Sequence, residues 1–149
     1  MDADSGVDLR RATASDLEGM LRLLEGEALP TAGVADSLGG FVVAEAEGRL
    51  VGVAGLEVHG GDGVLRSVAV RPAYRGLGIG GRLVERVLDA ARRADLRRLY
   101  LLTTTAEGYF RRHGFRPIER SDVAEKVRES VEFREACPAS AVAMVLENG

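Results

Sequence analysis

The segment that decides the fold is Arg75-Gly76-Leu77-Gly78-Ile79-Gly80, which lies between an apolar run at residues 64–70 and an amphipathic stretch. This order predicts a strand, a glycine-rich turn and a helix. Such a turn directs several backbone N–H groups to one point, beside the positive end of a helix dipole. Four glycines in six positions (76–81) also lose much conformational entropy on folding without any packing gain. The loop is therefore predicted to hold the phosphate or pyrophosphate of a small molecule.

Two familiar phosphate loops fit this segment poorly. A nucleotide-hydrolase loop ends in Gly-Lys-Ser/Thr, whereas this loop ends in Gly80-Gly81-Arg82-Leu83, without the lysine or the hydroxyl that holds magnesium. A dinucleotide fingerprint can be fitted by using Gly76, Gly78 and Gly81. That fingerprint belongs to the first strand–helix unit of its fold, and here about 70 residues precede it. Binding of NAD stays open as an alternative.

A third loop form, R-x-x-G-x-G, is met by Arg75, Gly78 and Gly80, directly after VAVRPAY at residues 68–74. With these flanks the segment resembles the acetyl-CoA-binding motif of the GNAT acetyltransferase superfamily. The resemblance implies acetyl-CoA as cosubstrate and no metal. It also implies that the loop amides hold the pyrophosphate, and that the preceding strand pairs with the pantetheine arm. The cofactor-binding residues implied in this way are Val68, Val70, Arg75, Gly76, Leu77, Gly78, Ile79, Gly80 and Gly81.

Length and composition favour one cytoplasmic domain spanning residues 1–149. The formal charge of −3 gives no broad attraction to nucleic acid or to membranes. Cys137 is the single cysteine, which excludes an internal disulfide and fits a reducing compartment, and it is expected to be a small buried apolar residue. The N-terminus lacks the pattern of a signal peptide, and no apolar run approaches the roughly 18 residues of a membrane span.

Hydrophobic periodicity predicts the order of the elements. Strands are expected at 7–12, 41–46, 50–58, 64–70, 96–102, 115–118 and 141–146. A first helix is expected after a cap at Thr13 or Ser15, with Ser15-x-x-Glu18 fitting a capping box. Further helices are expected at 34–38, from Ile79 to Arg93, at 106–112 behind a Thr105 cap, and from Ser121 or Asp122 to about Ser130. This order lacks the regular alternation of a doubly wound fold. It matches an α/β (α+β) GNAT fold with a mixed, mostly antiparallel sheet of about seven strands, and the resemblance covers nearly the whole chain.

A second GNAT motif, N-x-x-A-x-x-aromatic-Tyr-x-x-x-G-F, is met in part by residues 103–115, where Ala106, Gly114 and Phe115 match. Thr103 replaces the usual asparagine, which contacts the cofactor arm. Phe110 stands where the general-acid tyrosine is usual, and Tyr109 lies one residue earlier. One residue is about 100° of rotation on a helix, so Tyr109 cannot simply take over the role. Either the register shifts and Tyr109 is the acid, or no protein acid is used.

Amine acetylation also needs a way to deprotonate the amine. Glu57, near the end of a mostly apolar strand, is the candidate catalytic base; it would act through water or hold the substrate's cation. The alternative is an ordinary strand-end charge. His59 shares its face, and neither His59 nor His113 has partners at metal-ligand spacing. Arg66 either steers an acidic substrate or sits in an ion pair.

Several segments, including LYLLTTTA at residues 99–106 and GFRP at 114–117, resemble a GNAT branch associated with arsenic-resistance gene clusters. Within that branch, phenylalanine at position 110 and the threonine run are normal. The substrate does not follow from this branch. We expect an acetyl-CoA-dependent N-acetyltransferase that acts on the amine of a small molecule by direct attack in a ternary complex, with a role in arsenic or toxic-compound resistance. Since GNAT proteins are often dimers, a homodimer is expected. The alternatives are a non-catalytic acyl-CoA-binding module and a protein or peptide N-acetyltransferase.

Overall fold

The computed structural model describes residues 6–130, 133 and 140–147, so Cys137 lies outside the described residues. Seven strands form one sheet, and every neighbouring pair is antiparallel except β4 and β5. This confirms the predicted fold class and the mostly antiparallel sheet. In their order across the sheet, the strands are β1 (Val7–Arg11), β2 (Phe41–Ala46), β3 (Arg49–His59), β4 (Asp62–Val70), β5 (Arg98–Thr103), β7 (Val142–Glu147) and β6 (Arg116–Ile118).

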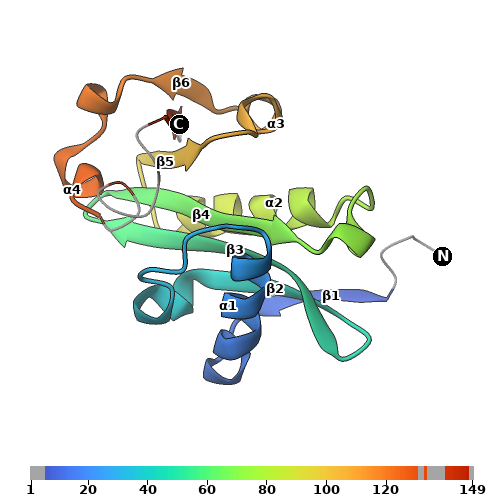
Figure 1. Cartoon of the computed structure of the whole chain (residues 1–149). Helices are drawn as coiled ribbons and strands as arrows, with labels where there is room; N and C mark the ends of the chain where they lie inside the picture. The colour runs from blue at the N-terminus through green and yellow to red at the C-terminus, as the bar shows by residue number, and fades with distance from the viewer. Residues whose placement is uncertain (1–5, 131–132, 134–139, 148–149) are drawn as a thin grey trace.

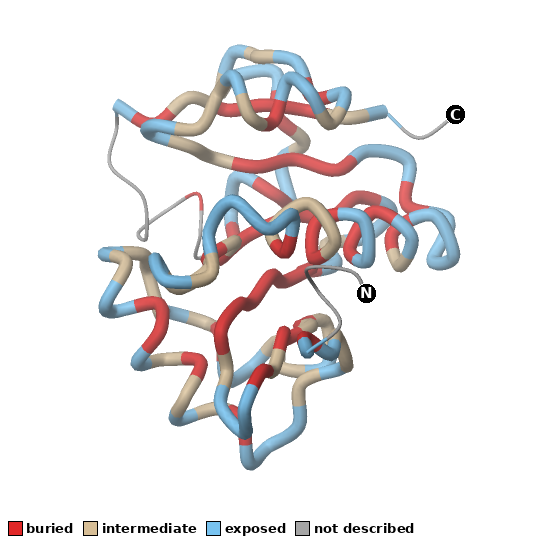
Figure 2. Tube along the Cα trace, turned by 90° about the vertical axis from the view of Figure 1, so that its right-hand side faces the viewer, coloured by how far each residue is buried: buried red, intermediate tan, exposed pale blue. Residues whose placement is uncertain are grey.

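The two long helices cover opposite faces of the sheet (Figure 1). Helix α2 (Ile79–Arg93) packs on β2, β3 and β4, and a Cβ added at Gly52 would lie 2.9 Å from Leu83 of this helix. Helix α1 (Leu17–Gly26) packs on the other face, where its buried side chains meet Val53. The apolar residues Met20, Leu23 and Leu24 of this helix are buried. Figure 2 shows the buried segments running through the central strands and α2.

The start of α1 differs from the prediction. A short 3-10 turn, η1 (Ala14–Asp16), comes first, and the Thr13 N–H donates to Asp16 Oδ2 at 2.7 Å. Arg10 donates to both carboxylate oxygens of Asp16, at 2.8 and 2.9 Å. These hydrogen bonds hold the pKa of Asp16 well below its usual range. The expected capping box of Ser15 and Glu18 is therefore wrong. The cap is the alternative residue, Thr13, which forms a capping box with Asp16, while Glu18 pairs with Arg22.

The loop between α1 and β2 carries η2 (Ala35–Gly40), and η3 (Pro72–Tyr74) precedes the glycine loop. Helix α3 (Glu107–Arg112) ends before Gly114, whose φ of +98° suits a residue without a side chain. The predicted helix at 121–130 is wrong in extent. It is a 3-10 turn, η4 (Arg120–Asp122), followed by α4 (Glu125–Arg128), because the backbone at Val123 and Ala124 is extended. This extension buries Val123 together with Val127.

Candidate active site

The sheet opens between its two parallel strands. Strands β4 and β5 pair only over three positions, the last of which joins Val64 to Tyr100. Beyond this point β4 bulges: its register with β3 shifts, and Ser67 has a φ of +60°. The backbone of β4 after Val64 therefore has no strand partner on its β5 side, and an extended ligand can pair there.

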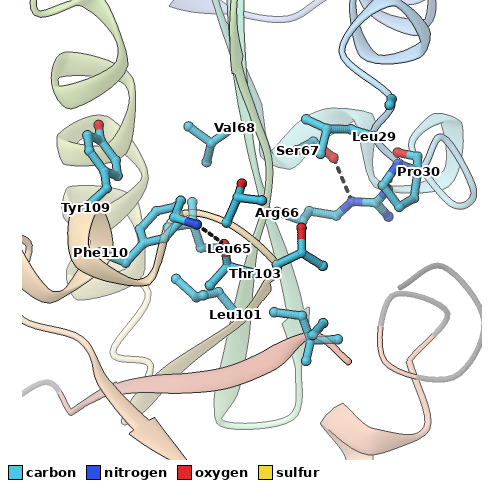
Figure 3. A pocket seen from close by; sticks show the side chains of 16 residues that line it. Leu29, Pro30, Leu65, Arg66, Ser67, Val68, Leu101, Thr103, Tyr109 and Phe110 are labelled. Carbon is cyan, nitrogen blue, oxygen red and sulfur yellow. Dashed lines mark hydrogen bonds between the residues drawn. The ribbon is translucent and has the colours of Figure 1, made fainter. Parts of the chain in front are cut away.

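A cavity of about 550 Å³ fills this opening, and we call it the splay cavity (Figure 3). Residues 65–68 of β4 and residues 101–106 of β5 and its following loop form two walls. Ala28, Leu29 and Pro30, beyond α1, form another wall. Tyr109 and Phe110 of α3 and Ala141, just before β7, complete the lining. Its polar side chains are hydroxyls and one guanidinium; among the described residues, no aspartate, glutamate or histidine lines it.

A second cavity of about 340 Å³ lies at the glycine loop, and we call it the loop cavity. It shares Val68 and Tyr109 with the splay cavity, so the two adjoin along β4. The structure thus brings most of the predicted cofactor-binding residues to one groove. Those that line the loop cavity are Val68, Val70, Arg75, Gly76, Gly78, Ile79, Gly80 and Gly81.

The glycine loop has the backbone that a phosphate site needs. Gly76 and Gly78 have φ values of +81° and +82°, which residues with a side chain rarely adopt. Gly78 precedes the first residue of α2, and its carbonyl accepts the Arg82 N–H at 3.1 Å. The N–H groups of residues 79–81 fall in the first turn of the helix, where they have no intrahelical acceptor. They form a donor set beside the positive end of the helix dipole.

Arg75 and Leu77 differ from the other residues of this loop in their surroundings. Arg75 Nε donates to the Val70 carbonyl at 3.1 Å, and its guanidinium pairs with Glu27 at the end of α1. Its side chain therefore braces the loop against the sheet and α1. Leu77, at the tip of the loop, is 41% exposed and does not line the loop cavity.

Thr103 lines the splay cavity and also begins the turn into α3. Its Oγ1 accepts the Ala106 N–H at 3.0 Å, the interaction drawn in Figure 3. The predicted Thr105 cap is therefore wrong, because Thr103 satisfies this backbone donor. The Thr103 hydroxyl can still donate its own proton in a hydrogen bond. The usual asparagine has a donor and an acceptor group, and Thr103 retains the donor function.

Glu57 is not brought into the splay cavity. Its carboxylate is 5% exposed and accepts from Arg66 Nη1 at 2.7 Å, while His59 Nε2 lies 3.0 Å from its other oxygen. Arg66 also donates to the carbonyls of Ala32 and Pro30, at 2.7 and 3.3 Å. The geometry therefore favours the ion-pair interpretation of both Glu57 and Arg66 over that of a free base. The pair ties β3 and β4 to the loop that walls the cavity.

Sequence reasoning missed Ser67, Leu29 and Pro30 as lining residues. Ser67 reaches the cavity because of the bulge, and nothing in the sequence around it signals a positive φ. Within the described part of the chain no group of three or more potential metal ligands occurs, and none of its helices is long and apolar enough to cross a membrane.

Comparisons with known proteins agree with this geometry. The sequence model of the family described as "Acetyltransferase (GNAT) domain" matches residues 37–117. An amino-acid acetyltransferase of Mycobacterium tuberculosis is 43% identical over 91 residues, which are 60% of this chain and 49% of that protein. The chain thus spans about half the length of this relative.

Solved structures show the same fold. Rv2747 from Mycobacterium tuberculosis, in complex with CoA and NLQ, matches with a TM-score of 0.82 and 30% identity, over 95% of this chain and 99% of that one. The N-acetylglutamate synthase of Neisseria gonorrhoeae, complexed with CoA and N-acetyl-glutamate, has a TM-score of 0.81 at 23% identity. That match covers 95% of this chain and 35% of the synthase chain, and it supports the fold alone. From the family match over more than half of its length, the chain belongs to the GNAT acetyltransferase domain family.

Proposed function

We propose that this chain is an acetyl-CoA-dependent N-acetyltransferase that acts on the amine of an amino acid. The observation that carries the proposal is the groove along β4, in which a donor-rich glycine loop adjoins a cavity where two parallel strands separate. A long ligand with a pyrophosphate near one end and a reactive group at the other fits such a groove. Rv2747, similar over nearly its whole length, binds CoA, and the relative that shares 43% of aligned residues is an amino-acid acetyltransferase.

The chain would bind the cosubstrate mainly through its backbone. The N–H groups at the start of α2 face the pyrophosphate, and the unpaired edge of β4 around Val68 and Val70 holds the pantetheine arm. The thioester then lies in the splay cavity, beside the bulge at Ser67. There, backbone N–H groups of β4 and the hydroxyls of Ser67 and Thr103 are the donors available to a developing oxyanion.

In the proposed reaction the amine attacks the thioester carbonyl carbon directly, within a ternary complex. A C–N bond forms, the carbonyl electron pair moves to oxygen, and its return expels the thiolate as the C–S bond breaks. One ammonium proton must leave before attack, because the nitrogen lone pair is the nucleophile. Since no described acidic or imidazole side chain lines the splay cavity, we propose that solvent water takes this proton. The nitrogen loses a second proton as the intermediate collapses to the amide, and the leaving thiolate takes up that proton through solvent. Glu57, first considered as the base, becomes a positioning residue that acts through Arg66.

The test is thiol release from acetyl-CoA across paired substrates. Each pair consists of an amino acid and the amine that lacks its α-carboxylate, so the difference in rate within a pair measures recognition of the carboxylate. The proposal predicts turnover of one or more amino acids and at least tenfold lower kcat/KM for the paired amines, as expected when a site's polar groups lose their partner. Tight CoA binding without turnover of any amine would instead support the acyl-CoA-binding module. Turnover of peptides alone would support a protein acetyltransferase.

Two finer predictions from the sequence have no support in the relatives compared here. The relative that is 43% identical is an amino-acid acetyltransferase, and a link to arsenic resistance stays a prediction, to be tested by growth of a deletion strain on arsenicals. The homodimer also stays a prediction, and light scattering on the purified chain measures it directly.

A further inference from the structure

Tyr109 carries an unexplained polar group at the junction of the two cavities. Its hydroxyl oxygen is buried, and no hydrogen-bond partner is found for it among the described residues. A buried hydroxyl without a partner costs roughly 1–3 kcal/mol, so such groups are rare unless a ligand or a water satisfies them. Tyr109 is also the single side chain of α3 that lines both the loop cavity and the splay cavity.

The direction of the side chain separates Tyr109 from Phe110. The two residues differ by about 100° around α3. The Phe110 ring lines the splay cavity alone and packs edge-on against Phe115, with ring centroids 5.9 Å apart. The Tyr109 hydroxyl faces the start of α2 instead: a Cβ added at Gly80 would lie 3.3 Å from its oxygen. Figure 3 shows the Tyr109 hydroxyl pointing away from Arg66 and Ser67.

The ring itself is held in place without the hydroxyl. It makes edge contacts to Phe110 and His113, with centroids 5.1 and 4.9 Å apart, and the Arg112 guanidinium lies 5.8 Å from its centroid. The hydroxyl is thus fixed at one point of the groove by contacts that do not use it. Burial raises the pKa of Tyr109, so the phenol stays protonated at neutral pH and is a hydrogen-bond donor there.

We propose that Tyr109 binds the cofactor and does not supply the proton to the leaving thiolate: its hydroxyl donates a hydrogen bond to an acceptor oxygen on the cofactor arm, where the arm leaves the glycine loop. This inference rests on the proposed function, since it takes acetyl-CoA as the ligand of the groove. It also explains why phenylalanine can stand at position 110, where a tyrosine is usual. The splay cavity keeps an apolar ring beside the thioester, and the hydroxyl one residue earlier serves the arm.

The test compares Tyr109→Phe with the parent protein by calorimetric titration of CoA and by steady-state kinetics. We expect the Kd for CoA and the KM for acetyl-CoA to rise about five- to tenfold, the effect of one hydrogen bond. We expect kcat and its pH profile to stay unchanged. Without CoA, the melting temperature of Tyr109→Phe should equal or exceed that of the parent, because the variant removes an unsatisfied buried group. The melting shift caused by CoA should shrink.

Tyr100→Phe is the matched control, because it makes the same chemical change at a residue that lines neither cavity. The Tyr100 ring is buried among Val64, Val123 and Val145, so this variant should bind CoA within twofold of the parent. An unchanged Kd for CoA in Tyr109→Phe would overturn this inference and leave the proposed function standing. A large fall in kcat, with loss of the alkaline limb of its pH profile, would also overturn it, because that is the signature of a general acid. If the parent protein bound no CoA, the proposed function would fall as well, and the two failures are thereby told apart.

Discussion

The buried guanidinium of Arg66 donates a hydrogen bond to the Glu57 carboxylate across 2.7 Å, and the same guanidinium reaches the Ala32 carbonyl at 2.7 Å. A pair of neighbouring strands is thereby tied to the loop after α1. That loop contributes Leu29 and Pro30 to the splay cavity. The ion pair, whose two side chains are 0% and 5% exposed, therefore shapes the wall of the site from behind.

Replacing Glu57 with glutamine separates this structural role from general-base catalysis. We expect Glu57→Gln to lower the free energy of unfolding by about 3 kcal/mol, because the buried Arg66 guanidinium loses the carboxylate that pairs with it at 2.7 Å. The KM for the amine should rise as the wall loosens, while kcat of the folded enzyme changes less than about threefold. Loss of a general base would lower kcat by about 100-fold or more. Denaturant unfolding and kinetics below the melting range measure both quantities.

Glu18→Gln is the control for this experiment. It removes the exposed pair of Glu18 with Arg22, which is expected to contribute less than about 0.5 kcal/mol. A collapse of kcat in Glu57→Gln, with stability near that of the parent, would restore Glu57 as the catalytic base.

The Asp16 carboxylate predicts a specific loss of stability in acid. Its pKa is lower in the folded protein than in the unfolded chain, so its contribution is complete above the unfolded pKa of about 3.9 and declines as the pH falls below it. At pH 7, Asp16→Asn should lose about 2 kcal/mol. The difference between parent and variant should narrow in unfolding curves taken from pH 5 down to pH 2.

Asp89→Asn provides the comparison, because Asp89 pairs with Arg92 at an exposed position. It should change stability by less than about 0.5 kcal/mol at any pH. If the difference in unfolding free energy between the parent and Asp16→Asn stayed constant down to pH 2, the lowered pKa of Asp16 in the folded protein would be contradicted.

The left-handed backbone at Gly78 predicts that alanine is poorly tolerated there. Gly78→Ala must adopt a φ of +82°, at about 1–2 kcal/mol, or shift the loop away from its ligand geometry. We expect the Kd for CoA to rise about tenfold or more, since a loss of 1.4 kcal/mol is tenfold. Gly26→Ala is the matched control, because Gly26 has an ordinary φ and no atom lies within 4 Å of the new Cβ. Its Kd for CoA should equal that of the parent. Equal affinities of the two variants would argue against the loop as the phosphate site.

The hydrogen bond from the Ala106 N–H to Thr103 predicts a cap-like contribution to stability. Thr103→Val keeps the shape of the side chain and removes the acceptor, and it should lower the free energy of unfolding by about 1 kcal/mol. Thr103→Ser retains the oxygen and should recover most of this loss. The prediction would be wrong if the valine and serine variants unfolded at the same denaturant concentration.

Much of the fold follows from local signals in the sequence. The glycine-rich segment 76–81, between an apolar run and an amphipathic run, predicted β4, the loop and α2, since few structures satisfy this pattern. The helix at 121–130 was overpredicted, because burial of Val123 and Val127 together overrides the local helical pattern. The sequence left the cap of this helix start open between Thr13 and Ser15, and Asp16 decides it, because Arg10 of β1 holds its carboxylate beside Thr13.

The site was predictable at its loop end and less so at its reactive end. Backbone donors follow from glycine spacing, which is local. The role of Glu57 depends on Arg66, nine residues away on the next strand, and on carbonyls of a loop more than 20 residues earlier. The Tyr109 hydroxyl depends on how α3 is set against the start of α2. Tertiary packing creates such contacts between residues far apart in the sequence, so no short stretch of sequence predicts them.

The most direct test of the account is a titration of the isotopically labelled chain with CoA, followed through its backbone amide NMR signals. The account predicts saturable shifts at Val68, Val70 and residues 76–81, with β6 (Arg116–Ile118) nearly unchanged. Saturable shifts centred on Arg86 and Arg93, which line a separate hollow near β2 and β3, would contradict it, as would the absence of binding.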